Sequence, residues 1–304
     1  MERWRRGVAI LKASWSILRG QPELMILPAA SAFGVIVLAG GFILLEALWS
    51  GAPKPGPELT NPWFYLATFV VYLLCAFIVV FANAALIFCA RRSLDGGRAT
   101  LREGLQAAAG RWPQILGWSA LAATVGLILK TLAGVCRGAA DDSKQNIIIS
   151  LIGLIVVSVL DAFWVMLTYF AMPVVALEGL GPIAAIRRSA ELIRQRWGEA
   201  LVGEGALGVF AVLGMLALFA VSALIIGVAN AVSVHAAVIV IGFSIIGVVA
   251  VIGSVALVTL NAIFVTGAYC YALRGEVPAA FANGLVEAVF KEDAKKQPPA
   301  AAAA

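Results

Sequence analysis

The sequence predicts an all-α fold: a polytopic transmembrane helical bundle of six spans, arranged as three hairpins, each preceded by a cytoplasmic amphipathic helix. Three observations lead to it: the composition, the lengths of the apolar runs, and the positions of lysine and arginine. Of the 304 residues, 62% are hydrophobic and 13% are charged, whereas soluble domains are close to half apolar and a quarter charged. A water-soluble fold has no means of burying that much apolar surface.

Six apolar runs, each with at most two charged residues, are long enough to cross roughly 30 Å of hydrocarbon, which takes about 20 helical residues. They lie at residues 24–49, 63–90, 113–135, 147–177, 199–229 and 236–273. Few charges interrupt residues 199–273, so three short spans would also fit there, although an odd number would carry the basic C-terminus outside. The N-terminal residues are basic and lack a short apolar core with a cleavage pattern, so we expect no signal peptide.

The lysines and arginines predict the orientation of the spans. Of 22 such residues, 18 lie before span one, after spans two and four, or after span six, and the alternate loops hold Lys54, Arg137 and Lys144. The positive-inside rule therefore places both termini in the cytoplasm, which predicts a multi-pass protein of the inner membrane. The same distribution accounts for the net charge of +5. Basic loops face anionic headgroups, so membrane lipids are the expected partners and nucleic acid is not.

The stretch ALEGLGPIAAIRRSAELIRQRWGEAL, residues 176–201, separates two spans with a different pattern. From Pro182 its apolar residues step by three and four while charged residues take the other side, which is the period of a helix. A basic amphipathic helix with a tryptophan near its end is typical of the membrane interface. The apolar positions are Ile183, Ile186, Ala190, Ile193 and Trp197.

Similar spacing occurs ahead of spans one and three and, more weakly, after span six. Aligning Gln21, Trp112 and Trp197 gives a period of 91 and then 85 residues, which predicts a unit of one interfacial helix and one transmembrane hairpin, used three times. The alternative is that any cytoplasmic loop before a span looks basic and amphipathic. The spaced residues are Trp4, Val8, Leu11, Trp15 and Leu18, then Leu101, Leu105, Ala108 and Trp112, and finally Phe281, Leu285 and Val289.

The predicted organisation is therefore a single transmembrane domain over residues 1–290. Its repeat units lie at about 1–94, 95–177 and 178–273, and a C-terminal amphipathic helix follows at 277–291. Residues 292–304 are expected to form a flexible tail.

Two short patterns resemble known families. The segment GVAILKASWSILRGQPELMILP resembles the opening of an uncharacterised bacterial family of integral membrane proteins, and the second half is similar to the membrane domain attached to some glycerophosphodiester phosphodiesterases and to related six-span proteins. The first resemblance implies nothing about activity, and the second carries over no phosphodiesterase activity, because the chain lacks the soluble domain. Together they imply a helical membrane domain of unassigned biochemical role. The matching residues are Lys12, Ser14, Trp15, Leu18, Glu23, Leu24 and Pro28, then Pro173, Glu178, Ala185 and Ser189.

Elementary physics gives two of these residues structural roles. Glu178 lies at the inner end of span four, just before the helix that begins at Pro182. Proline is favoured in a first helical turn, and a carboxylate there suits the helix dipole. Pro173 removes a backbone hydrogen bond one turn from the end of span four and is expected to kink it.

Chemistry within the membrane would depend on polar groups in the spans, where charge is costly. Asp161, near the predicted midplane of span four, is the sharpest such signal. Lys130 lies in the outer third of span three, where its stem can reach headgroups; its depth differs from that of Asp161 by roughly 10 Å at 1.5 Å per residue. Asn83 and Asn261 precede alanine in spans two and six as Asp161 does in span four, which predicts a polar ring inside the bundle. Interhelical packing is the alternative for the asparagines.

Several other kinds of site are not predicted. The single histidine is His235, and the sequence has no HExxH motif or Cys/His cluster, so we expect no metal. The four cysteines stand singly and predict no disulfide. Gly96 and Gly97 are typical of a turn, not of a phosphate-binding loop, and no cofactor is expected.

The sequence favours a protein without catalytic activity: a membrane scaffold, assembly or lipid-organising factor, with self-association left open. The alternative is a small transporter or permease in which Asp161 binds a proton or cation while Asn83 and Asn261 line the path. The scarcity of polar residues in the spans argues against a wide aqueous path, whereas internal repeats are common in transporters.

Overall fold

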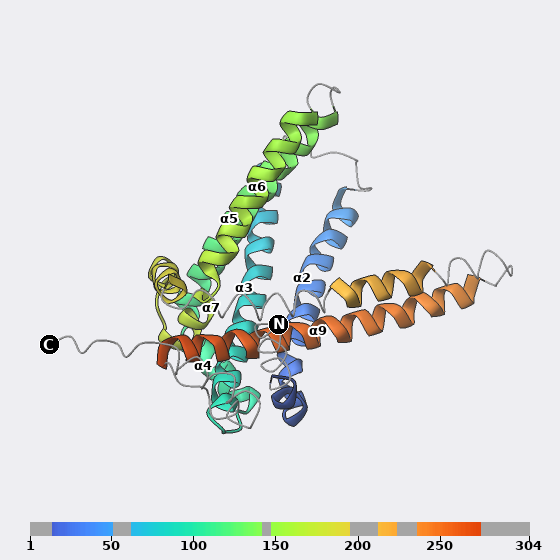
Figure 1. Ribbon diagram of the computed structural model, residues 1–304. Helices are drawn as coiled ribbons and strands as arrows, with labels where there is room; N and C mark the ends of the chain where they lie inside the picture. Colours follow the sequence, from blue (N-terminus) through green and yellow to red (C-terminus); the bar gives the residue numbers. More distant parts are fainter. Residues whose placement is uncertain (1–13, 51–61, 142–146, 195–211, 224–235, 275–304) are drawn as a thin grey trace, which may run out of the picture. The chain divides into compact units, whose positions relative to one another are not determined.

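The computed structural model describes residues 14–50, 62–141, 147–194, 212–223 and 236–274 (Figure 1). These residues form helices joined by turns, and no strand occurs among them, which confirms the all-helical class. The chain divides into two compact units, each assembled from segments far apart in the sequence. Unit 1 comprises Met1–Ile26, Cys89–Ala99 and Arg196–Ala304, and unit 2 comprises Leu27–Phe88 and Thr100–Gln195.

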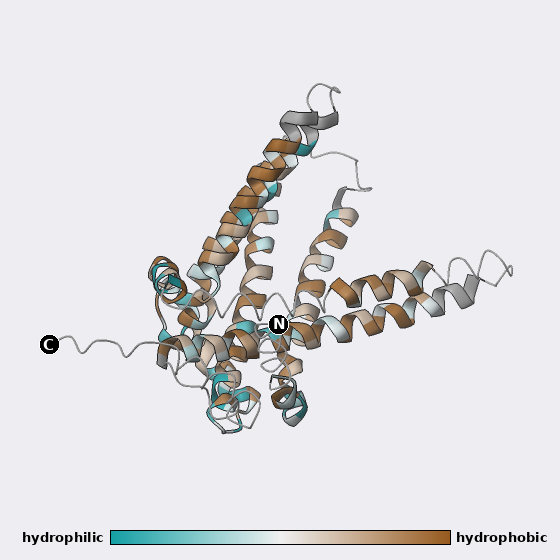
Figure 2. Ribbon diagram, viewed as in Figure 1, coloured by the Kyte–Doolittle hydropathy of each residue, from teal (hydrophilic) through white to brown (hydrophobic). Residues whose placement is uncertain are grey.

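Five of the six predicted spans correspond to helices long and apolar enough to cross a membrane. Hydrophobic residues follow these helices along their length (Figure 2). Their bounds lie close to those predicted: η1 (Pro22–Met25) with α2 (Ile26–Ser50), α3 (Pro62–Leu94), α5 (Trp112–Asp141), α6 (Ile147–Thr168) with α7 (Ala171–Pro173) and η3 (Val174–Glu178), and α9 (Ala236–Arg274).

The remaining predicted span, 199–229, lies mostly outside the described residues. Its described part, Val212–Ala223, is a short apolar helix. α9 is continuous over 39 residues, so no break into shorter spans occurs within it. The amphipathic helix predicted at 277–291 and most of the first one, before residue 14, lie outside the described residues, and the six-span arrangement stays a prediction.

Proline marks the start of several of these helices. Pro22 is the first residue of η1, Pro62 of α3 and Pro182 of the 182–194 helix, while Pro113 is the second residue of α5. A first-turn proline gives up no helical hydrogen bond, because the first N–H groups of a helix have no intrahelical partner, and its fixed φ suits a helix.

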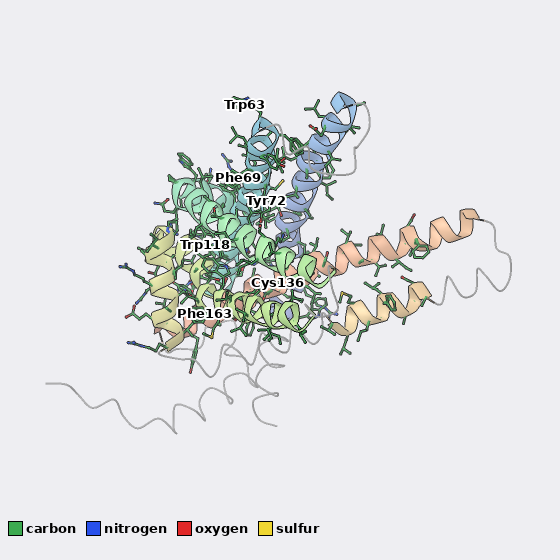
Figure 3. All side chains as sticks on the ribbon, turned by 90° about the horizontal axis from the view of Figure 1, so that it is seen from above. Trp63, Phe69, Tyr72, Trp118, Cys136 and Phe163 are labelled. Atoms are coloured by element: carbon green, nitrogen blue, oxygen red, sulfur yellow. The ribbon has the colours of Figure 1, made fainter. Side chains whose placement is uncertain are left out.

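In unit 2, α5 and α6 form a closely packed antiparallel hairpin. At one end, a Cβ placed on Gly153 would lie 2.6 Å from Sγ of Cys136, so glycine permits the approach. At the other end, the rings of Trp118 and Trp164 stack with centroids 6.4 Å apart. Figure 3 labels Trp118 and Cys136 on α5. These two contacts fix the register of the hairpin.

α3 contacts two other helices within unit 2. A Cβ on Gly34 of α2 would lie 3.5 Å from Cγ2 of Ile78, in ordinary van der Waals contact. On its other side, the Tyr72 hydroxyl would lie 3.6 Å from a Cβ on Gly126 of α5. Figure 3 labels Tyr72 on α3.

In unit 1, the end of α3 is held by the turn that precedes η1. The side chain of Gln21 accepts a hydrogen bond from the Ser93 hydroxyl (2.9 Å) and donates one to the carbonyl of Gly97 (3.5 Å). η1 contacts α9. The Val212–Ala223 helix runs antiparallel to the N-terminal half of α9 (Figures 1 and 3).

Buried side chains gather near one end of most long helices, whereas bulky apolar side chains elsewhere on them are exposed. Between 0% and 28% of each apolar stretch is buried. Apolar surface left open on this scale marks contact with a membrane or another protein. The buried residues include Ala84–Ile87 and Leu94 of α3, Ile115, Trp118 and Ser119 of α5, Phe170 and Val174–Ala176, and Ile263, Phe264, Tyr269 and Cys270 of α9.

Candidate functional site

The helix that contains Asp161 is broken near its end. α6 stops at Thr168, Tyr169 and Phe170 form a turn, and the chain resumes as α7 and the π-helical turn η3. Proline cannot donate the helical hydrogen bond, and its ring clashes with the carbonyl four residues earlier, which here belongs to Tyr169. The kink predicted from Pro173 is confirmed, and it lies one turn before the proline.

The break exposes the backbone N–H of Phe170, and Ser189 accepts its hydrogen bond. Ser189 is 0% exposed, and its Oγ lies 3.0 Å from the Phe170 nitrogen. A buried N–H without an acceptor costs free energy comparable to a lost hydrogen bond. The 182–194 helix therefore docks on the break through Ser189.

Arg111, next to the start of α5, closes the end of η3. Its guanidinium donates a hydrogen bond to the carbonyl of Ala176. The next turn is made by Gly179, whose φ of +71° is left-handed and favours glycine at the end of a helix. Pro182 then packs on Gly117 of α5, where a Cβ would lie 3.1 Å from the proline ring.

Glu178 and Glu191 both contact Arg188. The Arg188 guanidinium lies 2.9 Å from the Glu191 carboxylate and 3.6 Å from that of Glu178. The hydrogen bond to Glu191, opposed by partial burial and helped by the charge of Glu178, raises the pKa of Arg188 above its usual value. Arg188 thus ties the end of η3 to the short helix that follows it.

The face that the 182–194 helix buries is not its predicted apolar stripe. It buries Ala185, Ser189 and Leu192, which line up on one side because they are three and four residues apart. In the stripe, Ile183 is 67% exposed. The other described members, Ile186, Ala190 and Ile193, are half-buried. Among the described residues of the stripe, only Ile183 is therefore exposed.

The exposed side of the same helix carries positive charge beside Ile183. Arg187 and Arg194 are seven residues apart, so they lie above one another on the helix. Both are exposed and make no hydrogen bond or ion pair with the described residues. One face thus docks on protein, the apolar stripe is half-buried except at Ile183, and Ile183 is exposed beside Arg187 and Arg194.

Two other short helices share this design where the structure describes them. α4 (Leu101–Ala109) starts at a capping box, in which Thr100 and Glu103 exchange hydrogen bonds of 3.3 and 3.2 Å. It buries Gly104 and Ala108 and exposes Leu105.

The 14–20 helix has a comparable layout. It buries Ser14 and Leu18 and exposes Trp15. The Arg19 guanidinium lies 5.3 Å from the centroid of the Trp15 ring, so the exposed aromatic side chain carries a positive charge over its face. The helices predicted before spans one and three are confirmed over these residues.

The end of α3 in unit 1 resembles the end of η3. Asp95 precedes Gly96, whose φ is +86°, as Glu178 precedes Gly179. Arg91 pairs with Asp95 at 2.9 Å and donates to Sγ of Cys270 on α9. The turn predicted at Gly96 and Gly97 is confirmed. An acidic residue followed by a left-handed glycine ends both apolar segments.

The four predicted intramembrane residues are not joined by any hydrogen bond or ion pair within the described residues. Asp161 on α6 and Lys130 on α5 are exposed, and Asn83 on α3 is half-buried, all in unit 2. Asn261 on α9 is exposed, in unit 1. The polar ring stays a prediction.

Sequence reasoning missed the roles of Arg111, Arg188 and Gly179. In the sequence the arginines count only as positive charges at a membrane surface, because Ala176 and Glu178, which they contact, lie in another element, η3. The one local signal for this junction is a glycine directly after an acidic residue at the end of an apolar run, at both Gly96 and Gly179.

The described residues include five long apolar helices with exposed apolar surface, and short basic helices lie at the ends of these long ones. This combination is typical of an integral membrane protein. The chain belongs to a family of unknown function, DUF6159, whose model matches residues 63–279. The match includes the Pro173 to Ser189 pattern and excludes the N-terminal one. No curated protein matches the chain, and the similarity to the phosphodiesterase-associated membrane domain stays a prediction.

Proposed function

We propose that this protein is a non-catalytic scaffold of the cytoplasmic membrane that organises anionic lipids, with both termini in the cytoplasm. The observation that carries the proposal is that the 182–194 helix docks on protein with one face and leaves Ile183 exposed beside the exposed arginines Arg187 and Arg194. A helix of this kind lies in the membrane interface with its apolar face in lipid and its arginines at the headgroups.

The arrangement of arginines supports a role in headgroup binding. Arg188 is held by Glu178 and Glu191, which leaves Arg187 and Arg194 available to an anion outside the protein. Each basic residue near an anionic surface adds about 1 kcal/mol of attraction. Arg102 on α4 is exposed as well, so two helices of unit 2 offer arginine to the same kind of partner.

Native mass spectrometry of the protein purified from lipid tests this proposal. We expect wild type to retain phosphatidylglycerol or cardiolipin over phosphatidylethanolamine. Replacing both Arg187 and Arg194 by glutamine is expected to weaken retention on the order of fivefold per residue. Arg137→Gln is the matched control, because it removes an exposed arginine from the opposite end of α5. Equal retention by all three proteins would overturn the proposal.

The predicted similarity to the membrane domain of some phosphodiesterases rests on one junction of this chain. That junction, between the broken helix and the 182–194 helix, contains Pro173, Glu178, Ala185 and Ser189, so this pattern encodes how the 182–194 helix is attached. No phosphodiesterase chemistry is proposed for this chain.

A small transporter is the second candidate, because Asp161 is exposed in the middle of an apolar helix and makes no hydrogen bond or ion pair with the described residues. Infrared titration of wild type and Asp161→Asn in lipid tests it. A protonated carboxyl band that titrates near neutral pH, disappears in the variant and accompanies proton uptake into liposomes would favour transport. A band that never appears would remove this candidate.

A further inference from the structure

Two opposite charges on the α5–α6 hairpin have no partner within the part of the chain that the structure describes. Lys130 and Asp161 are both exposed, and neither makes a hydrogen bond or ion pair with the described residues. A charged side chain facing hydrocarbon is costly and as a rule pairs, reaches water or faces another protein surface. Something outside the hairpin is therefore expected at both positions.

The register of the hairpin separates the two residues by about 7 Å in depth. The contacts Cys136 to Gly153 and Trp118 to Trp164 place Lys130 opposite Val156–Val157. Asp161 lies roughly four to five residues further along α6, a step of about 7 Å at 1.5 Å per residue. The flexible four-carbon stem of a lysine covers most of such a step.

The two residues also lie on the same side of the hairpin. At about 100° per residue, Lys130 is rotated roughly 120° from the face of α5 marked by Trp118 and Cys136. Asp161 is rotated by about 70° from the face of α6 marked by Gly153 and Trp164. Each rotation is measured from the face that contacts the other helix, and both have the same sense along the chain. Because α5 and α6 run antiparallel and face each other, equal senses of rotation bring Lys130 and Asp161 to the same side of the hairpin.

This side is bordered but not covered by α3. Tyr72 of α3 reaches α5 at Gly126, one turn before Lys130, and Lys130 and Asp161 remain exposed beside it. The surface therefore has room for a further helix, and it carries one positive and one negative group at fixed depths.

We propose that a second copy of the chain binds this side, so that Lys130 of each copy pairs with Asp161 of the other. Copies inserted in the same orientation and related by a two-fold axis along the membrane normal keep equal depths, and the surface is then self-complementary. The charges specify the partner, since an unrelated apolar helix would leave both unpaired. The proposal does not depend on lipid binding.

Cross-complementation between two charge-reversed variants tests the proposal. Asp161→Lys has two positive charges on this side and Lys130→Asp has two negative ones, so each variant is expected to self-associate on the order of tenfold more weakly than wild type. Mixed copies restore both pairs. Carrying different tags and co-expressed, the two variants are expected to co-purify in lipid nanodiscs as a mixed dimer in excess of either like pair.

The matched control is Val156→Lys, which places a charge at an exposed position of α6 on the opposite side of the hairpin. It is expected to leave the wild-type dimer intact. A mixed dimer in excess supports the proposal, because pairing within one chain cannot be restored by a second chain. Monomeric wild type, or variants that combine at random, would overturn it while leaving the lipid measurement unaffected.

Discussion

The backbone N–H of Phe170 donates a hydrogen bond to Oγ of Ser189, 3.0 Å away and 19 residues further along the chain. Pro173 breaks the helix one turn after Phe170, and Ser189 satisfies the group that the break exposes. The pattern from Pro173 to Ser189 therefore describes one junction, in which a membrane-length helix is fastened to a short amphipathic one.

Ser189→Ala is expected to destabilise the protein by about 1–3 kcal/mol, because the buried N–H of Phe170 loses its acceptor. Thermal unfolding in detergent or nanodiscs measures the change. Ser158→Ala is the control, since the Ser158 hydroxyl is exposed and bonds the carbonyl of Leu154 in its own helix. An equal, small effect of both substitutions would show that the Phe170–Ser189 bond contributes little.

Gly179→Ala is expected to cost about 1–2 kcal/mol, because its left-handed backbone is unfavourable for a residue with a Cβ. The added atom would also lie 3.3 Å from Nε of Arg111. Gly181→Ala, two residues on, meets nothing within 4 Å and should leave the unfolding temperature unchanged or slightly raised. The unfolding temperatures of the two variants test this prediction. A similar loss of stability in both variants would contradict the left-handed turn at Gly179.

Gly153→Cys is expected to form a disulfide with Cys136 under mild oxidation. A Cβ at Gly153 would lie 3.4 Å from that of Cys136, close to the roughly 3.5–4.5 Å found in disulfides. After proteolysis between the two helices, gel mobility shows whether the disulfide still holds the fragments together. This disulfide should be absent when Cys136→Ala is combined with Gly153→Cys. Gly134→Cys, in open space, should not form it; a failure of Gly153→Cys to cross-link would place α5 and α6 in another register.

Arg188→Gln is expected to lower stability by up to about 1 kcal/mol, as for an exposed ion pair. The raised pKa of Arg188 means that its contribution is complete below the unfolded-state pKa and is lost only as the pH rises through the folded one, far above neutrality. The loss should therefore be the same at pH 6 and pH 9, and smaller in high salt. Arg187→Gln should have no such effect on unfolding, and a matching loss there would refute the assigned pairs.

The sequence was sufficient for elements that depend on local composition. Apolar run length predicted the bounds of α3, α5 and α9 closely, and Pro182 and Pro173 marked a helix start and a kink that the structure confirms. The sequence did not predict which face of the 182–194 helix is buried, because its strongest apolar stripe is not the docking face. Ala185, Ser189 and Leu192 are buried instead, and Ser189 bonds a residue 19 positions earlier in the chain.

The predicted intramembrane site shows another limit of sequence reasoning. Residue type and depth singled out Asp161 and Lys130, but hairpin register, set by the glycine contact of Gly153 and the Trp118 stack, decides how far apart they lie. That register depends on interhelical packing, which periodicity alone does not encode.

The 182–194 helix is proposed to lie in the membrane interface with the stripe residue Ile186 towards lipid and the opposite side of the helix, at Ala184, towards water. Spin labels placed singly at Ile186 and at Ala184, in a cysteine-free background reconstituted in anionic liposomes, test it by their accessibility to oxygen and to a water-soluble nickel chelate. The label at 186 is expected to be relaxed mainly by oxygen and the label at 184 mainly by the chelate. Equal and strong relaxation of both labels by the chelate would place the helix in water and contradict the claim.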